Sequence, residues 1–121
     1  MRVLAAMVVI ASALMAACGK DAPTRQVAGG EADQGRRLIE QYQCGACHAI
    51  AGVAGAGGNA GPPLAGLARR SYIAGRLPNM PQNLVAWLVN PPAHKPGTLM
   101  PDLGVSPAEA RHMAAYLYTL Q

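Results

Sequence analysis

The chain has 121 residues, a formal charge of +4 and 51% hydrophobic residues, which fits one small domain and leaves little room for a second. Charged residues make up only 13%, which argues against intrinsic disorder, and the charge is too small to indicate nucleic-acid binding. Three Cys are too few for a disulfide-stapled scaffold. With no Phe, one Trp and four Tyr, the core is expected to need help from a non-protein group.

Residues 1–17 have the pattern of an export signal. Arg2 precedes fifteen uncharged residues, a stretch too short for a membrane-spanning helix and typical of a signal peptide. The stretch ends in Leu14-Met15-Ala16-Ala17-Cys18, which is similar to a bacterial lipobox and predicts a lipid on Cys18. The alternative is simple secretion with cleavage near Ala17, which would leave Cys18 as a chance thiol.

Residues 18–30 have the composition of a flexible linker or tether, with charged residues, Pro23 and Gly29-Gly30 but no hydrophobic period. The packed domain is therefore predicted over residues 31–121. Loss of Arg2 with the signal peptide lowers the formal charge from +4 to +3, so the domain is only mildly basic.

The first predicted helix covers residues 31–43. Leu38, Ile39 and Tyr42 follow the i, i+1, i+4 pattern of one helical face. Gly35 has two interpretations: it allows the last helix to approach closely, or it is a tolerated glycine near a helix N-terminus.

The motif Cys44-Gly45-Ala46-Cys47-His48 follows this helix. C-x-x-C-H is the attachment pattern for a c-type haem, because two thiols at this spacing can bond the two vinyl groups of one porphyrin. His48 then follows directly as the proximal iron ligand. The alternatives are a thioredoxin-like redox pair, a structural zinc site, a simple disulfide or a chance match, but no βαβ pattern or second ligand cluster accompanies the motif.

A second axial ligand must come from a downstream Met or His, and the candidates are Met80, Met100, Met113, His94 and His112. We favour Met100, because the run from Pro96 to Pro101 cannot be helical and holds the side chain on a stiff loop. Met80, before a helix start, ranks second. Met113 lies in the last helical segment, where a Met usually fills the core; His94 is expected to be exposed and His112 to lie on a helix surface.

The remaining elements are a loop and two helices. Residues 51–61 form a Gly- and Ala-rich loop suited to passing close to a flat macrocycle. A helix is predicted over residues 81–89, ending before Pro91-Pro92. Ser106-Pro107-Ala108-Glu109 is a capping box that opens the last helix.

Together with Gly61-Pro62-Pro63-Leu64 and the run from Asn90 to Met100, the haem motif resembles a class I monohaem c-type cytochrome. The resemblance covers the chain from about residue 30 to 120. It implies an all-α, small cytochrome c fold with three to five helices wrapped around one covalent haem c. The stretch from Ile73 to Leu84 is similar to the cytochrome c domain fused to subunit II of some bacterial haem–copper oxidases.

The resemblance implies roles for four further positions. The Pro62 carbonyl would accept the Nδ1–H of His48, and Leu64 would pack on the haem. Arg70 would lie near a haem propionate, and Trp87 would line the pocket. The alternatives are a solvated cation for Arg70 and plain core packing for Trp87.

The function implied by the resemblance is one-electron transfer by an electron carrier that is not itself an enzyme. Expected partners are a terminal oxidase or an upstream quinol-oxidising complex, on the periplasmic side of a bacterial membrane to which a lipid on Cys18 tethers the chain. The alternatives are a haem subunit of a larger oxidase or dehydrogenase complex, a haem enzyme or sensor with an open sixth site, and an interaction lipoprotein without haem.

Overall fold

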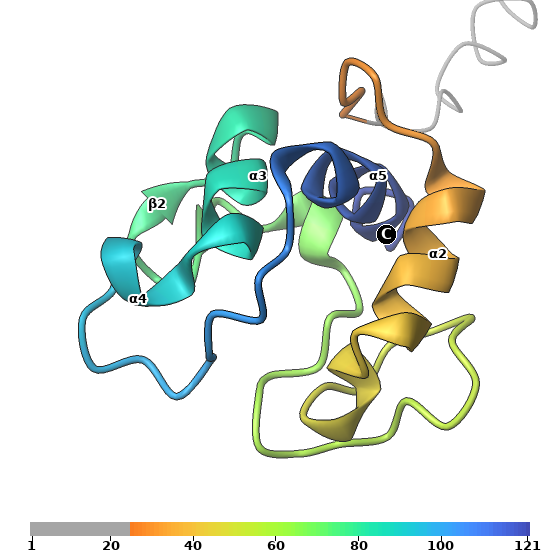
Figure 1. Ribbon diagram of the computed structural model, residues 1–121, viewed down its shortest axis with the longest axis horizontal. Coiled ribbons are helices and arrows are strands. Elements are labelled where there is room, and N and C mark those ends of the chain that lie inside the picture. The colour runs from red at the N-terminus through yellow and green to blue at the C-terminus, as the bar shows by residue number, and fades with distance from the viewer. Residues whose placement is uncertain (1–24) are drawn as a thin grey trace, which may run out of the picture.

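The computed structural model describes residues 25–121, and Figure 1 shows them as helices beside one small hairpin. The elements are α2 (Ala32–Gln41), η2 (Cys44–Ala46), η3 (Leu67–Arg69), β1 (Tyr72–Ile73), β2 (Leu77–Pro78), α3 (Pro81–Val89), α4 (Pro91–His94) and α5 (Pro107–Leu117), where η marks a 3₁₀ turn. The predicted all-α class is confirmed. Within residues 25–121, no helix combines the length and the apolar character that crossing a membrane requires.

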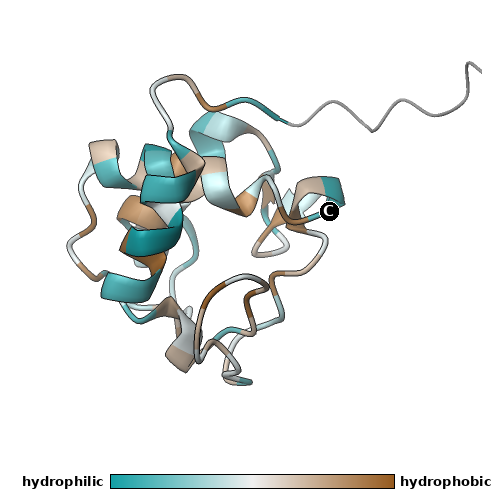
Figure 2. Cartoon of the chain, turned by 90° about the vertical axis from the view of Figure 1, so that its right-hand side faces the viewer, coloured by the Kyte–Doolittle hydropathy of each residue, from teal (hydrophilic) through white to brown (hydrophobic). Residues whose placement is uncertain are grey.

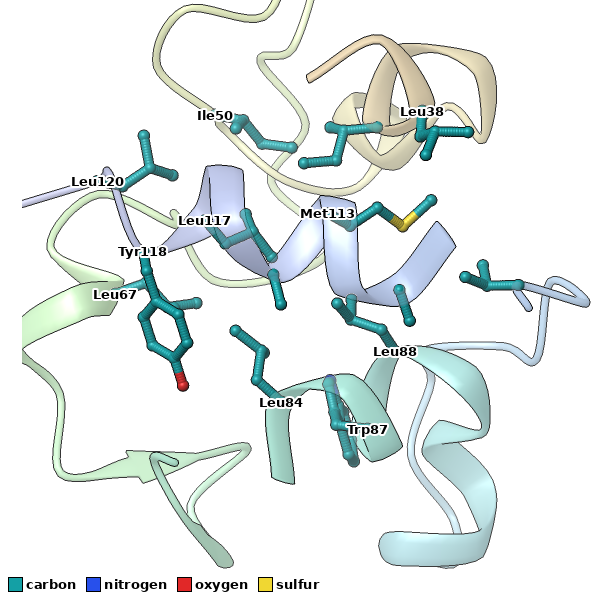
Figure 3. Close-up of a cluster of buried hydrophobic side chains, with 14 of the residues drawn as sticks. Leu38, Ile50, Leu67, Leu84, Trp87, Leu88, Met113, Leu117, Tyr118 and Leu120 are labelled. Atoms are coloured by element: carbon teal, nitrogen blue, oxygen red, sulfur yellow. The ribbon is translucent and has the colours of Figure 1, made fainter. Parts of the chain in front are cut away.

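The core lies where α5 packs against α2 on one side and α3 on the other. In Figure 3, Met113 extends from α5 towards α2, while Leu84 and Leu88 extend from α3 towards α5. Met113 is only 1% exposed, so its predicted role as core filler is confirmed. Figure 2 shows α2 with hydrophilic residues on its outer face and hydrophobic residues turned towards the interior, as burial of a single stripe requires.

Helix α2 is shorter than predicted. It ends at Gln41, and Gln43 adopts a left-handed conformation with φ of 55°, which a continuing helix cannot contain. At the other end, Glu31 is the N-cap residue, but its side chain caps no N–H of the helix. Its own N–H donates to Nδ1 of His112 at 2.9 Å. His112, expected as a helix-surface residue, thus satisfies one of the free N–H groups at the start of α2.

Gly35 is a point of close backbone approach between α2 and α5. It is buried, and a Cβ at this position would overlap the backbone carbonyl of His112 and come within 3.0 Å of the Met113 nitrogen. The structure therefore selects the close-approach interpretation of Gly35: only hydrogen fits between the two helices.

The capping box predicted at the start of α5 is confirmed. Ser106 Oγ accepts from the Glu109 N–H at 3.3 Å, and Glu109 Oε2 accepts from the Ser106 N–H at 2.9 Å. The same Oε2 also accepts from the hydroxyls of Ser106, at 2.7 Å, and Tyr42, at 3.1 Å. These donors hold the pKa of Glu109 below its ordinary value, the Ser106 hydroxyl having the largest effect. The Tyr42 bond also joins the end of α2 to the start of α5.

Helix α3 has the predicted bounds, but α4 and the β1–β2 hairpin were not predicted. Pro91 and Pro92 begin α4 rather than ending the chain's helical path. Both fit at the first positions of a helix, where an N–H has no partner, and Asn90 Oδ1 accepts from the Ala93 N–H at 3.1 Å. The hairpin pairs Ile73 with Leu77 in strands of two residues each.

The packed unit already includes residues assigned to the linker. Arg25 donates to the Ala68 carbonyl at 2.9 Å, and its guanidinium carbon lies 5.7 Å from the centre of the Tyr118 ring. Val27 packs against the core. Contacts with the packed unit therefore extend back to Arg25, within the segment predicted as a linker. The predicted signal peptide and Cys18 lie outside the described residues.

One buried polar network secures this end of the fold. Asn79 is 2% exposed; its Oδ1 accepts from the Tyr118 hydroxyl at 2.8 Å, and its Nδ2 donates to the carbonyls of Leu67 and Arg70 at 2.8 and 2.9 Å. The network joins the end of α5 to the segment around η3, and burial raises the pKa of Tyr118.

Gly35→Ala is expected to destabilise the domain, because the new methyl group forces α2 and α5 apart. Overpacking of this kind costs about 1–3 kcal/mol, and each kcal/mol lowers Tm by roughly 4–8 °C in a domain of this size. Thermal unfolding followed by circular dichroism measures the effect. Gly57→Ala is the matched control, since no atom lies within 4 Å of a Cβ there; equal losses for both variants would contradict the close-packing account.

Glu109 is expected to make stability depend on pH. Because its folded-state pKa is lowered from 4.5, its contribution is complete above that value and is lost as the pH falls through the lower folded-state value. The wild type should therefore lose more of its Tm between about pH 6 and about pH 3 than Glu109→Gln does. Glu40→Gln, which removes an exposed partner of Arg36, should follow the wild type; parallel curves for wild type and Glu109→Gln would refute the prediction.

Candidate haem site

The two motif cysteines are placed on the same side of a tight turn. Cys44–Ala46 forms η2, and the N–H groups of Cys47 and His48 both donate to the Cys44 carbonyl, at 3.2 and 3.0 Å. In such a turn, side chains three residues apart nearly eclipse each other. Both thiols are free, and burial, with a smaller effect from Cys47, raises the pKa of the Cys44 thiol. The turn thus presents two free thiols on the same side.

His48 is held by the segment that carries Gly61 and Pro62. Its Nδ1 lies 2.7 Å from the Pro62 carbonyl, which can only accept, so Nδ1 carries the proton and Nε2 keeps a free electron pair. The Gly61 N–H donates to the Cys47 carbonyl at 2.8 Å. A Cβ on Gly61 would overlap the imidazole and lie 2.7 Å from Nδ1, so the backbone packs directly on the ring.

The Gly- and Ala-rich loop is attached to the motif and to α5. The Gly58 N–H donates to the Gly45 carbonyl at 3.0 Å. The Tyr116 hydroxyl donates to the Ala51 carbonyl at 2.6 Å. The loop thus folds back over the cysteine turn. Its small residues allow this contact within the chain as well as any contact with a macrocycle.

Arg70 braces the loop that follows Pro62. Its Nη2 donates to the carbonyls of Pro63 and of Ala65, the latter at 3.0 Å. Leu64 lies between these acceptors, half-buried against the core. Arg70 is half-buried, whereas Arg69 is exposed. Of the two arginines, Arg70 is therefore the one built into the site.

The candidate axial ligands occupy different environments. Met100 is half-buried at the edge of the core, and its N–H donates to Thr98 Oγ1 at 3.3 Å. Met80 is 47% exposed immediately before α3. His94 is half-buried on α4 rather than fully exposed. Trp87 is 7% exposed on α3, farther from α5 than Leu84 and Leu88 (Figure 3).

The ends of two helices bring the cysteine turn and the Met100 segment towards each other. The turn starts just after α2, and the Met100 segment leads into α5. The bond from Tyr42 to Glu109 joins these two helix ends. The cysteine turn and the segment that carries Met100 therefore adjoin the same junction, between the end of α2 and the start of α5.

The donor set fits a covalently held haem better than the alternatives. It comprises two free thiols on one side of a turn, an imidazole with a defined free nitrogen and a thioether on a restrained loop. Within residues 25–121, no group of three or more His, Cys, Asp or Glu side chains is arranged to hold a metal ion, so the zinc alternative finds no second donor pair there.

Three long-range hydrogen bonds of the domain were not predicted from the sequence. They join Tyr42 to Glu109, Tyr116 to Ala51 and Tyr118 to Asn79, across 39 to 67 positions of the chain. No local pattern encodes such pairs. The one available signal was their chemistry, since a Tyr or Asn in a core needs a polar partner.

Comparisons with known proteins agree with this geometry. The family profile for cytochrome c matches residues 32–121. The chain is also similar to cytochrome c oxidase subunit 2 of Alkalihalophilus pseudofirmus, with 39% identity over 93 residues that cover 74% of this chain and 26% of that protein. The chain thus spans about a quarter of that relative's length. A domain of this type carries out haem-based electron transfer. The chain belongs to the cytochrome c family, and its cofactor is one covalently bound haem c.

Proposed function

We propose that the protein is an electron carrier of a bacterial respiratory chain, in which Cys44 and Cys47 would hold the haem and His48 and Met100 would bind its iron. The observation that carries this proposal is the 2.7 Å contact from His48 Nδ1 to the Pro62 carbonyl. It leaves Nε2 free and orients the ring, which is what a proximal ligand requires.

The bound haem supplies one-electron exchange between its oxidised and reduced states. The protein's part is to bind, orient and exclude. With His48 and Met100 both as iron ligands, water and substrates would be kept from the iron, and the Met thioether would favour the reduced state. Leu64 would pack on the haem and Trp87 would line its pocket, where both would exclude solvent.

Arg70 is suited to binding a haem propionate. Only its Nη2 donates to the Pro63 and Ala65 carbonyls. Among residues 25–121, the N–H groups on Nη1 and Nε have no acceptor. They are therefore available to a carboxylate, with which a guanidinium pairs well. Bracing of the loop and binding of a propionate are therefore compatible roles for one side chain.

Cys18 is proposed to carry a lipid that tethers the domain to the periplasmic side of a membrane, where a terminal oxidase or a quinol-oxidising complex exchanges electrons with it. The similarity to an oxidase subunit supports the respiratory assignment. It also supports a second candidate, a haem subunit of a larger oxidase complex. Gentle solubilisation and size-exclusion chromatography separate the two: a subunit elutes with other chains, whereas a carrier elutes alone.

Met100→Ala should abolish the weak red sulfur-to-iron absorption band of the oxidised protein and lower its reduction potential, because the thioether is the ligand that favours the reduced state. Met80→Ala is the matched control and should keep both the band and the potential. The absorption spectrum and a redox titration measure these effects.

Absence of the band from the wild type at neutral pH, or its survival in Met100→Ala, would overturn the ligand assignment. A band lost only in Met80→Ala would transfer the role to Met80. If the wild type lacks the band and binds small ligands such as azide, the haem enzyme or sensor with an open sixth site becomes the better reading.

Cys18→Ser should release the protein from the membrane fraction without changing its haem spectrum. Each CH₂ group of an acyl chain that enters the membrane contributes about 0.8 kcal/mol to the free energy of membrane binding. On Triton X-114 partitioning, most of the wild type should therefore enter the detergent phase and most of the variant the aqueous phase. A wild type that stays in the aqueous phase would favour simple secretion.

A further inference from the structure

The segment that carries Met100 is tied to another part of the fold at its first residue. Residues 95–104, here called the Met100 loop, join α4 to the approach to α5. The ammonium of Lys95 donates to the Ala74 carbonyl at 3.1 Å, across 21 positions of sequence. Lys95 is half-buried. It is therefore a specific contact of the loop with the β1–β2 hairpin rather than a solvated surface charge.

The acceptor is held in a fixed direction by an unusual turn. Ala74 and Gly75 both have positive φ, 52° and 69°, and the Arg76 N–H donates to the Ile73 carbonyl at 3.0 Å, the pattern of a type I′ turn. A left-handed Ala is disfavoured because its Cβ crowds the following carbonyl. Ala74 also packs against the core, so its carbonyl cannot turn freely.

A short series of hydrogen bonds connects Lys95 to Met100. The Lys95 N–H donates to the Pro91 carbonyl at 3.0 Å, which fixes its backbone at the end of α4. The Thr98 N–H donates to the Lys95 carbonyl at 3.0 Å, and the Met100 N–H donates to Thr98 Oγ1 at 3.3 Å. A restraint on Lys95 is thereby passed through two turns to the residue that binds the iron.

We propose that Lys95 is a positioning residue for Met100: its bond to Ala74 holds the Met100 loop closed and so disfavours detachment of the Met100 sulfur. This inference rests on the proposed His48–Met100 ligation. The role of Lys95 is then to restrain the Met100 loop, which differs from attracting a partner by its charge. The bond to Ala74 acts in this way whatever partner docks on the protein.

Imidazole competition against the oxidised holoprotein tests the proposal. Imidazole binds the iron only when the Met100 sulfur leaves it, so its apparent affinity reports how easily the loop opens, and the loss of the weak red band measures it. Lys95→Met keeps the alkyl stem and removes the donor. Because one hydrogen bond of this kind is lost, the variant should bind imidazole about three- to thirty-fold more tightly than the wild type.

Two further variants separate the bond from charge and from bulk stability. Arg76→Met removes a cation from the same hairpin; Arg76 is exposed and makes no side-chain hydrogen bond or ion pair among residues 25–121. It should stay within about two-fold of the wild type. Lys95→Arg, which keeps donor groups, should recover part of the wild-type value. The reduction potential should fall further in Lys95→Met than in Arg76→Met.

Equal imidazole affinities for Lys95→Met and Arg76→Met would overturn the positioning role. So would a Lys95→Arg variant that opens as readily as Lys95→Met, because the donor would then be irrelevant. Failure of the underlying ligation is recognised separately: it leaves the wild type without the red band or Met100→Ala with it, whereas failure of this inference alone leaves both of those results intact.

Discussion

The contact of α2 with α5 at Gly35 determines where the two halves of the haem site lie. Helix α2 leads into the cysteine turn, and α5 is entered from the Met100 loop, so the spacing of these helices sets the spacing of the chain segments that approach the haem. With hydrogen at Gly35, the helices meet at backbone distance. A methyl group at Gly35 would push the helices apart, and the displacement would spread along both of them, because protein interiors are close-packed and transmit strain.

Two hydrogen bonds then hold both ends of α2 against the first half of α5. The Glu31 N–H at the start of α2 donates to His112, and the Tyr42 hydroxyl just after its end donates to Glu109. The second bond reaches the carboxylate that also completes the capping box of α5. One carboxylate oxygen of Glu109 therefore caps the start of α5 and joins it to the end of α2, from which the cysteine turn follows.

Much of this architecture was predictable because it depends on local patterns. The apolar period of residues 81–89 and the Ser106–Glu109 capping box specify α3 and the start of α5 with their observed bounds. The cysteine motif was recognisable because covalent attachment dictates its spacing. The sequence left Gly35 open, since a helix glycine looks the same whether or not a second backbone lies against it.

What escaped prediction depends on distant partners or on exceptions to local rules. Two prolines usually end a helix, yet at Pro91 and Pro92 they begin one, because Asn90 supplies the cap. Ala74 in a left-handed turn contradicts residue preference and is maintained by packing. The linker appeared unstructured because the carbonyls and the Tyr118 ring that bind Arg25 lie more than forty residues away in the chain.

The contact of Arg25 would shorten the tether that the proposed lipid on Cys18 provides. Between an anchored Cys18 and Arg25, seven residue steps span at most about 25 Å even when fully extended, which is comparable to the width of the domain itself. If residues 25–29 detached from the domain, the tether would lengthen by five further residue steps. Held by the proposed lipid, the domain would stay in a thin shell above its membrane, where its local concentration for a neighbouring membrane complex would far exceed that of a freely diffusing protein.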